Sequence, residues 1–334
     1  MSKGSITCCC FLLLAIAVLP SAAVQSPPYG QLQVQGSKLM SSSGKQIILR
    51  GMSLFWSQWD PKYWNAETVN QLKCKWGINI LRAPMGVEGS DGYLQSAAAN
   101  TANTQKLMTV VDACINAGIY VIIDWHYTSG TAYTDKAVEF FKKMAQKYGK
   151  NPHILYEVWN EPVGVDWKQV LKPYHQRLIS AIRTIDPDNV ILLGTPNYSM
   201  DLNSVVSSPI TGQKNIMYSF HFYAADSTPS EQTKQQNMVK KVTQGGLPVF
   251  VTESGAGSGG SNSPVNLPIM NQWLSLLEQL KISYIIWGVR GEGNYQNPLK
   301  QGTAPANVGL SSSLTDYGKV VKNVFTKNGQ PKGC

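Results

Sequence analysis

Two apolar runs of the sequence each end in a glutamate. The first is Leu155-Tyr-Glu-Val-Trp-Asn-Glu161, and the second, Val249-Phe-Val-Thr-Glu253, brings its glutamate 92 residues later. Retaining hydrolysis of a glycosidic bond needs two carboxyl groups about 5–5.5 Å apart, because one protonates the departing sugar oxygen while the other attacks the anomeric carbon. We therefore predict that Glu161 is the acid/base and Glu253 the nucleophile of such a reaction.

The elements that must position these glutamates recur along the whole chain. Apolar, β-branched runs at 47–54, 78–83, 119–124, 154–159, 190–194, 216–222, 248–252 and 283–287 alternate with helical patterns such as 135–148. Near-continuous hydrophobicity is typical of parallel strands that helices cover on both faces. Eight alternating units predict an α/β fold, a single closed (β/α)8 TIM barrel.

Two further segments complete the predicted domain. Residues 32–34 and 38–40 flank a Gly-Ser turn and predict a short N-terminal β-hairpin that caps the bottom of the barrel. The Gly/Ser-rich stretch 254–263 precedes a predicted helix at 267–280, so we interpret it as a loop after the seventh strand and not as a linker. Residues 24–334 then form one catalytic domain.

Polar and aromatic side chains end six of the predicted strands. The carboxyl ends of barrel strands meet on one face, so these side chains are expected to gather around the two glutamates. A structural ion pair, a core histidine or a packed tryptophan would explain each one alone, but burying several carboxylates without partners costs several kcal/mol each. Besides Glu161 and Glu253, the candidates are Arg82, His126, Asn160, His221, Tyr223 and Trp287.

A division of roles follows from the chemistry. Arg82 beside Glu253 would lower the pKa of that carboxyl, and the hydroxyl of Tyr223 would orient it. Glu161, in a drier setting beside Trp159, would have a raised pKa and so carry a proton near neutrality.

The substrate would be bound by a donor and by flat rings. Asn160 is expected to donate to a sugar 2-hydroxyl, a bond that strengthens in the transition state. Trp287 and Trp56 would offer flat apolar faces to pyranose rings.

The ordered set of motifs resembles glycoside hydrolase family 5, in particular its secreted β-1,4-endoglucanases. The stretches that carry the resemblance are Arg50-Gly-Met-Ser-Leu-Phe-Trp56, Asn79-Ile-Leu-Arg82, Asp124-Trp-His126, Asn151-Pro-His-Ile-Leu-Tyr-Glu-Val-Trp-Asn-Glu-Pro162, Gly194-Thr-Pro-Asn197, Ser219-Phe-His-Phe-Tyr223 and Phe250-Val-Thr-Glu253. The resemblance implies a double displacement without metal or cofactor that retains the β-configuration, with a cellulose-like polysaccharide as substrate.

Three departures from the family pattern leave the polymer open. Ser254 and Tyr198 stand where this branch usually has tryptophan, and 288–293 replaces residues that usually contact leaving-side sugars. The same barrel and mechanism acting on mannan, xylan or mixed β-glucan is therefore an alternative. A non-catalytic carbohydrate-binding barrel is an alternative from another class, although binding alone does not need this acid and nucleophile set.

The N-terminus has the layout of a secretory signal. Lys3 precedes an apolar stretch from Cys8 to Leu19, and Pro20 with small residues follows, which predicts a signal peptide at 1–23 and a secreted, extracellular protein. Twelve apolar residues fall short of the roughly 20 that span a bilayer, so no membrane anchor is expected.

Without the signal, the chain keeps Cys74, Cys114 and Cys334. A bridge between Cys74 and Cys114, or two buried free thiols, are equal alternatives.

Composition excludes several other classes. Hydrophobic residues at 43% and charged residues at 15% indicate a globular protein with a large core. The net charge is +9, but Lys and Arg are dispersed, so no nucleic-acid partner is expected. Four dispersed histidines predict no metal site, and phosphate-binding glycine motifs are absent from the sequence. We expect a monomer whose partner is a β-linked polysaccharide.

Overall fold

Eight parallel strands close into a barrel in the order β10-β11-β12-β3-β4-β5-β7-β9. The structure is a computed structural model that describes residues 1, 25–259, 263–291, 297–328 and 334. Every predicted strand is present, which confirms the (β/α)8 barrel. The strands are β3 (Arg50–Leu54), β4 (Ile80–Gly86), β5 (Tyr120–His126), β7 (Ile154–Glu157), β9 (Val190–Leu193), β10 (Ile216–Tyr223), β11 (Val249–Gly255) and β12 (Tyr284–Val289).

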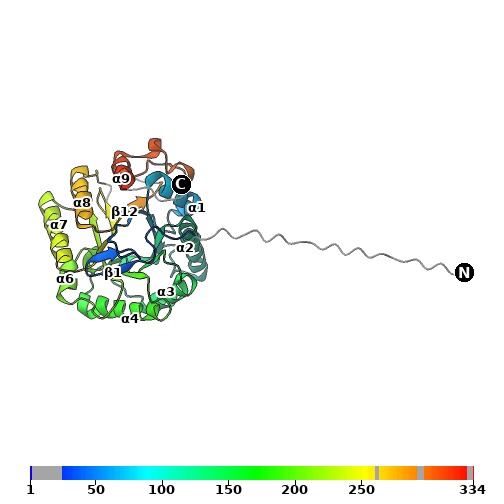
Figure 1. Cartoon of the computed structure of the whole chain (residues 1–334), viewed down its shortest axis with the longest axis horizontal. Coiled ribbons are helices and arrows are strands. Elements are labelled where there is room, and N and C mark those ends of the chain that lie inside the picture. Colours follow the sequence, from blue (N-terminus) through cyan, green and yellow to red (C-terminus); the bar gives the residue numbers. More distant parts are fainter. Residues whose placement is uncertain (2–24, 260–262, 292–296, 329–333) are drawn as a thin grey trace.

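Helices surround the barrel on its outside (Figure 1). Apolar residues at helical spacing explain why they pack there: in α3, Ala137, Phe141, Met144 and Tyr148 are buried. Helix α8 has the predicted bounds, so the segment before it is a loop. The helices are α1 (Ala66–Gln71), α2 (Ala97–Ala117), α3 (Thr134–Tyr148), α4 (Lys172–Arg183), α5 (Pro196–Ser199), α6 (Leu202–Ser207), α7 (Pro229–Gln244), α8 (Leu267–Leu280) and α9 (Asp316–Lys327), with short turns η1 (Pro61–Tyr63), η2 (Leu72–Trp76), η3 (Trp167–Leu171), η4 (Pro305–Asn307) and η5 (Ser311–Ser313).

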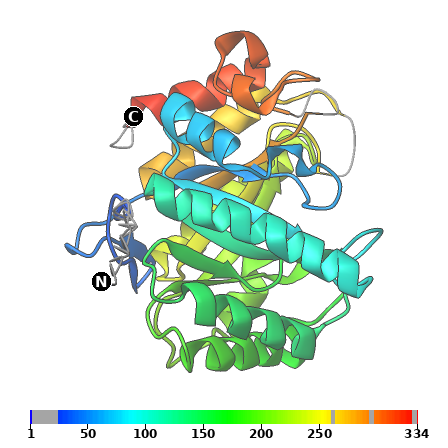
Figure 2. The same cartoon turned by 90° about the vertical axis from the view of Figure 1, so that its right-hand side faces the viewer.

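Two small two-stranded sheets lie outside the barrel wall. The hairpin of β1 (Gln33–Gln35) and β2 (Lys38–Met40) lies at the N-terminal end of the strands (Figure 2), where Leu32 and Leu39 belong to the core cluster that fills this end. The predicted cap is therefore confirmed. The second sheet pairs β6 (Thr128–Ser129) with β8 (Glu161–Pro162) and continues from the carboxyl ends of β5 and β7.

The cysteine pairing differs from both expectations. Cys74 on η2 is bonded to Cys334, with the Cα atoms 5.5 Å apart, and Cys114 on α2 is free and buried. A Cys74–Cys114 bridge and two free thiols are thus both wrong. The physical reason is that α9 packs against η2 and leads the chain end back to Cys74.

The predicted signal peptide lies outside the described residues, apart from Met1. Within the described ranges, no helix combines the length and the apolar composition needed to cross a bilayer.

Candidate active site

A single buried guanidinium organises the mouth of the barrel. Arg82, on β4, is fully buried, donates hydrogen bonds to three side chains and forms an ion pair with a fourth. Its Nε lies 2.8 Å from Oε2 of Glu157, one terminal nitrogen 2.8 Å from Oε2 of Glu253, and the other 2.6 Å from Oδ1 of Asn160 and 2.9 Å from Oδ2 of Asp124. Three carboxylates and the amide therefore share one cation, which compensates the cost of burying them.

Glu253, at the end of β11, is held through both carboxylate oxygens. Arg82 donates to Oε2, and the hydroxyl of Tyr223 on β10 donates to Oε1 at 2.6 Å. Burial, together with the nearby charge of Glu253, raises the pKa of Tyr223 well above its usual value, so this phenol stays a donor. The contacts that the sequence predicts for Arg82 and Tyr223 are present.

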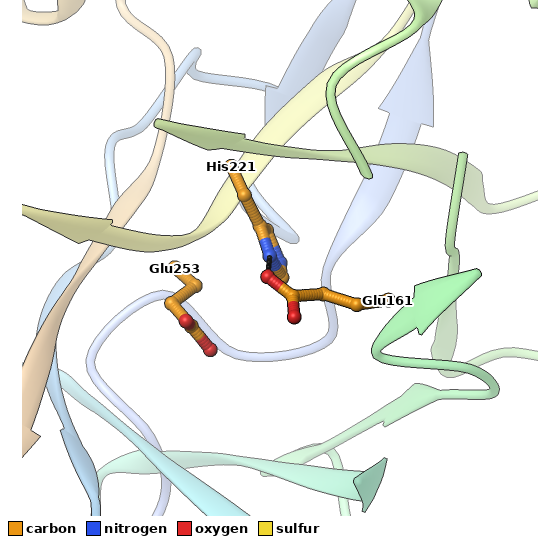
Figure 3. A group of neighbouring side chains, drawn as sticks. All are labelled: Glu161, His221 and Glu253. Atoms are coloured by element: carbon orange, nitrogen blue, oxygen red, sulfur yellow. Dashed lines mark hydrogen bonds and ion pairs between the residues drawn. The ribbon is translucent and has the colours of Figure 1, made fainter. Parts of the chain in front are cut away.

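Glu161 opens β8 and is held from the opposite direction. Its Oε1 contacts Nδ1 of His221 at 3.1 Å, and its Oε2 accepts a hydrogen bond of 2.7 Å from the hydroxyl of Thr128 on β6. The other ring nitrogen of His221 lies 2.9 Å from the hydroxyl of Thr252. Figure 3 shows the carboxyl groups of Glu161 and Glu253 projecting into one space beside His221.

The separation of the two carboxyl groups is short. An oxygen of Glu161, a ring nitrogen of His221 and an oxygen of Glu253 all lie within 4.8 Å of one another. An inverting enzyme needs about 6.5–9.5 Å between its carboxyl groups to admit a water, whereas a retaining one has about 5–5.5 Å. Side chains of these three types also bind metals, but both oxygens of each glutamate already accept hydrogen bonds from protein donors.

The pKa values in this cluster depart from their usual ranges. Burial alone would lower the pKa of His221, but its contacts with Glu157 and Glu161 raise it to about 9. Burial alone would raise the pKa of Glu161, but hydrogen bonds with His221 and Thr128 outweigh it and lower that pKa. The expectation of a raised pKa at Glu161 is therefore wrong for this arrangement. Trp159 does not create a dry setting for this carboxyl, because its ring packs on Tyr127 and Tyr174 in the wall. The Glu161–His221 pair binds one proton near neutrality.

His126, at the end of β5, pairs with Asp124. Its Nδ1 lies 2.7 Å from Oδ2 of Asp124. Burial and the charge of Arg82 lower the pKa of His126 to about 3, so its ring is neutral near pH 7, and burial raises the pKa of Asp124 well above its usual value.

Two tryptophans flank this imidazole. The ring of Trp287, in β12, stacks on His126 with the centroids 5.3 Å apart, and the ring of Trp56, after β3, meets it edge-on at 4.2 Å. Trp287 also lies under Arg82 at 5.9 Å. Both tryptophans therefore lie beside the buried cluster, and their role as sugar platforms stays a prediction. Trp59 stacks on Trp56 and is half exposed, whereas Trp64, Trp125, Tyr127 and Trp167 are buried and pack the barrel rim.

A strained loop after β9 supports Asn160. Asn197, Tyr198 and Ser199 are all left-handed, with φ of 54°, 59° and 56°, a run that non-glycine residues seldom adopt. The hydroxyl of Ser199 donates to the carbonyl oxygen of Asn160 at 2.7 Å. Gly194, before this loop, lets the chain lie directly against the backbone of Trp159, since a Cβ there would lie 2.1 Å from the carbonyl oxygen of Trp159.

Sequence reasoning missed three residues of this cluster. Asp124 and Glu157 lie side by side in the register of β5 and β7, and both bind Arg82. Their signal was a charge inside an otherwise apolar strand, with Asp124 two residues before His126 and so on the same face. Thr128 carried no signal, because nothing in the sequence pairs β6 with β8.

Comparison with known proteins agrees with this geometry. The model of the family described as Cellulase (glycosyl hydrolase family 5) matches residues 40–293, more than half of the chain. The chain belongs to glycosyl hydrolase family 5. It is thus a glycoside hydrolase.

Individual relatives span nearly the whole chain. Endoglucanase Z of Dickeya dadantii is 38% identical over 95% of this chain and 71% of its own length. A structure from Cytophaga hutchinsonii has a TM-score of 0.84 at 36% identity and covers 90% of this chain and 95% of that one. The catalytic domain of a Thermobifida fusca endoglucanase, in complex with cellotetraose, has a TM-score of 0.80 at 28% identity and covers 89% and 98%.

Proposed function

We propose that this family 5 hydrolase is an endo-β-1,4-glucanase that cleaves internal bonds of cellulose-like chains and retains the anomeric configuration. The observation that carries the mechanism is the pair of carboxyl oxygens of Glu161 and Glu253 within 4.8 Å. That separation allows direct attack by a carboxylate and leaves no room for an intervening water.

The first displacement uses both glutamates. A carboxylate oxygen of Glu253 forms a bond to the anomeric carbon while the bond from that carbon to the leaving sugar oxygen breaks. The electron pair moves to the leaving oxygen, which takes a proton from Glu161. We propose that a bound sugar excludes water from Glu161 and raises its pKa, so that the proton held by the Glu161–His221 pair moves to the carboxyl.

The second displacement restores the enzyme. Glu161, now ionised, removes a proton from water, and the hydroxide oxygen bonds to the anomeric carbon as the bond to Glu253 breaks. Tyr223 and Arg82 then stabilise the released carboxylate of Glu253, to which they donate at 2.6 and 2.8 Å. Two inversions give net retention.

Substitution of each glutamate tests these roles. We expect Glu161→Gln and Glu253→Gln each to lower kcat by at least about a thousandfold, because neither residue can perform the other's step. Azide should rescue a Glu253→Ala variant with formation of the α-azide and a Glu161→Ala variant with the β-azide, which separates nucleophile from acid/base. Turnover like the wild type in either Gln variant would refute the assignment.

The polymer is tested separately. The names of the relatives and the cellotetraose bound to the T. fusca domain support a β-1,4-glucan. We expect viscosity to fall faster than reducing ends appear on carboxymethylcellulose, with mannan, xylan and lichenan as parallel substrates. Activity confined to one of these three would keep the mechanism and change the substrate.

We also propose that residues 1–23 are a secretion signal and that 24–334 is the mature enzyme. The charged start, the short apolar stretch and the small residues before Val24 support this, as does the Cys74–Cys334 bridge, since disulfides persist in oxidising compartments. N-terminal sequencing of the protein from the medium of an expressing eukaryotic cell should begin at Val24.

A further inference from the structure

A cationic side chain, Arg290, lies against the aromatic rings next to the active site. Arg290 directly follows β12, and its guanidinium carbon lies 4.2 Å from the ring centroid of Phe55. Phe55 in turn packs on Trp287 with ring centroids 5.4 Å apart. The ring of Phe55 therefore lies between Arg290 and the indole of Trp287, which in turn contacts Arg82.

A second cation adjoins this position. A Cβ added to Gly291 would lie 1.9 Å from Nζ of Lys62, so this ammonium touches the residue after Arg290. Asp60 accepts a hydrogen bond of 3.0 Å from the amide of Gly291, which fixes the backbone there. Among the described residues, neither Arg290 nor Lys62 forms an ion pair with a carboxylate.

The barrel order places Arg290 relative to the scissile bond. In the closed ring of eight strands, β12 stands opposite β7, the strand that leads to Glu161. The acid protonates the leaving sugar, so the leaving side of the cleft is the side of Glu161. Arg290 therefore lies toward the part of the chain that stays attached to Glu253 after the first step, whereas the family resemblance implies leaving-side contacts for 288–293.

We propose that Arg290, assisted by Lys62, binds carboxylate groups carried by the polysaccharide on this side, so that the enzyme favours acidic β-linked glycans over neutral glycans of the same backbone. This deepens the proposed hydrolysis and rests on it. A planar guanidinium can bind a carboxylate through two parallel hydrogen bonds, and the contact of Arg290 with the Phe55 ring restricts the position of the guanidinium before binding. Uronic acid units or carboxymethyl substituents supply the required group.

Two polymers with the same glucan backbone test the proposal. Carboxymethylcellulose is anionic and hydroxyethylcellulose is neutral. We expect Arg290→Gln to lower kcat/KM on carboxymethylcellulose by about three- to tenfold, mainly through KM, and to leave hydroxyethylcellulose within about twofold. Added salt at 0.5 M should shrink the difference, since it screens exposed charges.

Matched variants separate a local contact from overall charge. Lys240→Gln removes the same unit of charge from the exposed face of α7 and should change neither polymer. Arg290→Lys keeps the charge but loses the planar fork, and should recover part of the preference. Thermal midpoints of all variants within about 2 °C of the wild type would exclude misfolding as the cause.

Binding gives a readout independent of turnover. Tryptophan fluorescence titration with each polymer should show weaker binding of Arg290→Gln to carboxymethylcellulose alone. Equal losses on both polymers, or an equal effect of Lys240→Gln, would overturn the carboxylate preference while leaving the hydrolase proposal intact. Absence of turnover by the wild type on both polymers would refute the proposed function, and the titration would still decide whether Arg290 selects acidic chains.

Discussion

Glu161 is held by a histidine and a threonine hydroxyl, one on each carboxyl oxygen. A hydroxyl suits both steps of the proposed mechanism, since it donates to the carboxylate and accepts from the protonated acid. The proton itself is stored on the pair with His221, whose pKa is raised to about 9 by Glu157 and Glu161. Above about pH 9 this pair loses its proton, so kcat should fall on the alkaline side.

Thr128 provides a prediction about this alkaline limb. Thr128→Val removes the hydrogen bond that favours the ionised form of Glu161, so the Glu161–His221 pair binds its proton more tightly. The alkaline fall of kcat should therefore move to higher pH by as much as about one pH unit. The peak kcat should fall about three- to tenfold, because the carboxyl loses one of its two constraints. Thr128→Ser keeps the hydroxyl and is the matched control. The measurement is the pH profile of kcat from pH 5 to 10; an unchanged limb in the Val variant would show that the hydroxyl does not act on Glu161.

At the level of single residues, sequence reasoning succeeded where a side chain ends an apolar run. This pattern predicted Glu161, Glu253, Arg82 and His221 as site residues. The structure brings these four side chains together. The direction of the pKa shift of Glu161 was not predictable from sequence. Burial raises this pKa, and two hydrogen bonds from other strands lower it. Sequence supplies the residue types, but only the fold supplies these partners.

At the level of elements, the eight strands were predictable because parallel strands covered on both faces are almost continuously apolar. The strand ends were less clear: β4 and β5 continue past Ala83 and Asp124 to Gly86 and His126. Pro84 and Gly86 are rare in strands and His126 is polar, so the sequence pattern stops early although the backbone ladder continues. The loop after β9 was also hidden, since a left-handed run has no simple sequence signal.

The N-terminal hairpin allows a prediction about the opposite end of the barrel. Leu39, on β2, is 2% exposed and packs into the cluster that closes the lower end. Leu39→Ala should lower the free energy of unfolding by about 2–5 kcal/mol, since it removes buried apolar contacts and leaves a cavity. Activity at 25 °C should be unchanged, because the site lies at the other end of the strands. Urea unfolding measures this effect. The exposed neighbour gives the control Lys38→Ala, and equal midpoints for the two variants would show that the hairpin does not close the core.

At the level of the whole molecule, one covalent bond joins the first helical unit to the chain end. Cys74 and Cys334 are 260 residues apart in sequence, and α9 brings them together by packing on η2. Sequence reasoning missed the pairing because distance along the chain says nothing of which helices become neighbours when a barrel closes. Cys114 was the nearer candidate, but it faces the core from α2.

The bridge predicts how stability responds to reduction. Cross-linking residues so far apart restricts the unfolded chain, so Cys74→Ser should lower the free energy of unfolding by about 2–4 kcal/mol. Cys334→Ser should have the same effect, and the double variant should cost no more than either alone, because all three lose one bond. The measurement is urea unfolding with and without dithiothreitol: the wild type should lose stability on reduction, whereas the three variants should not respond.

Cys114→Ala is the control for the thiol that takes no part in the bond. Burial raises the pKa of Cys114 above its usual range, so its thiol stays protonated and should not exchange with the disulfide. This variant should therefore keep the full response to dithiothreitol, whatever small change its core packing causes. Loss of the response in Cys114→Ala, or its persistence in Cys74→Ser, would mean that a different pair of cysteines closes the molecule.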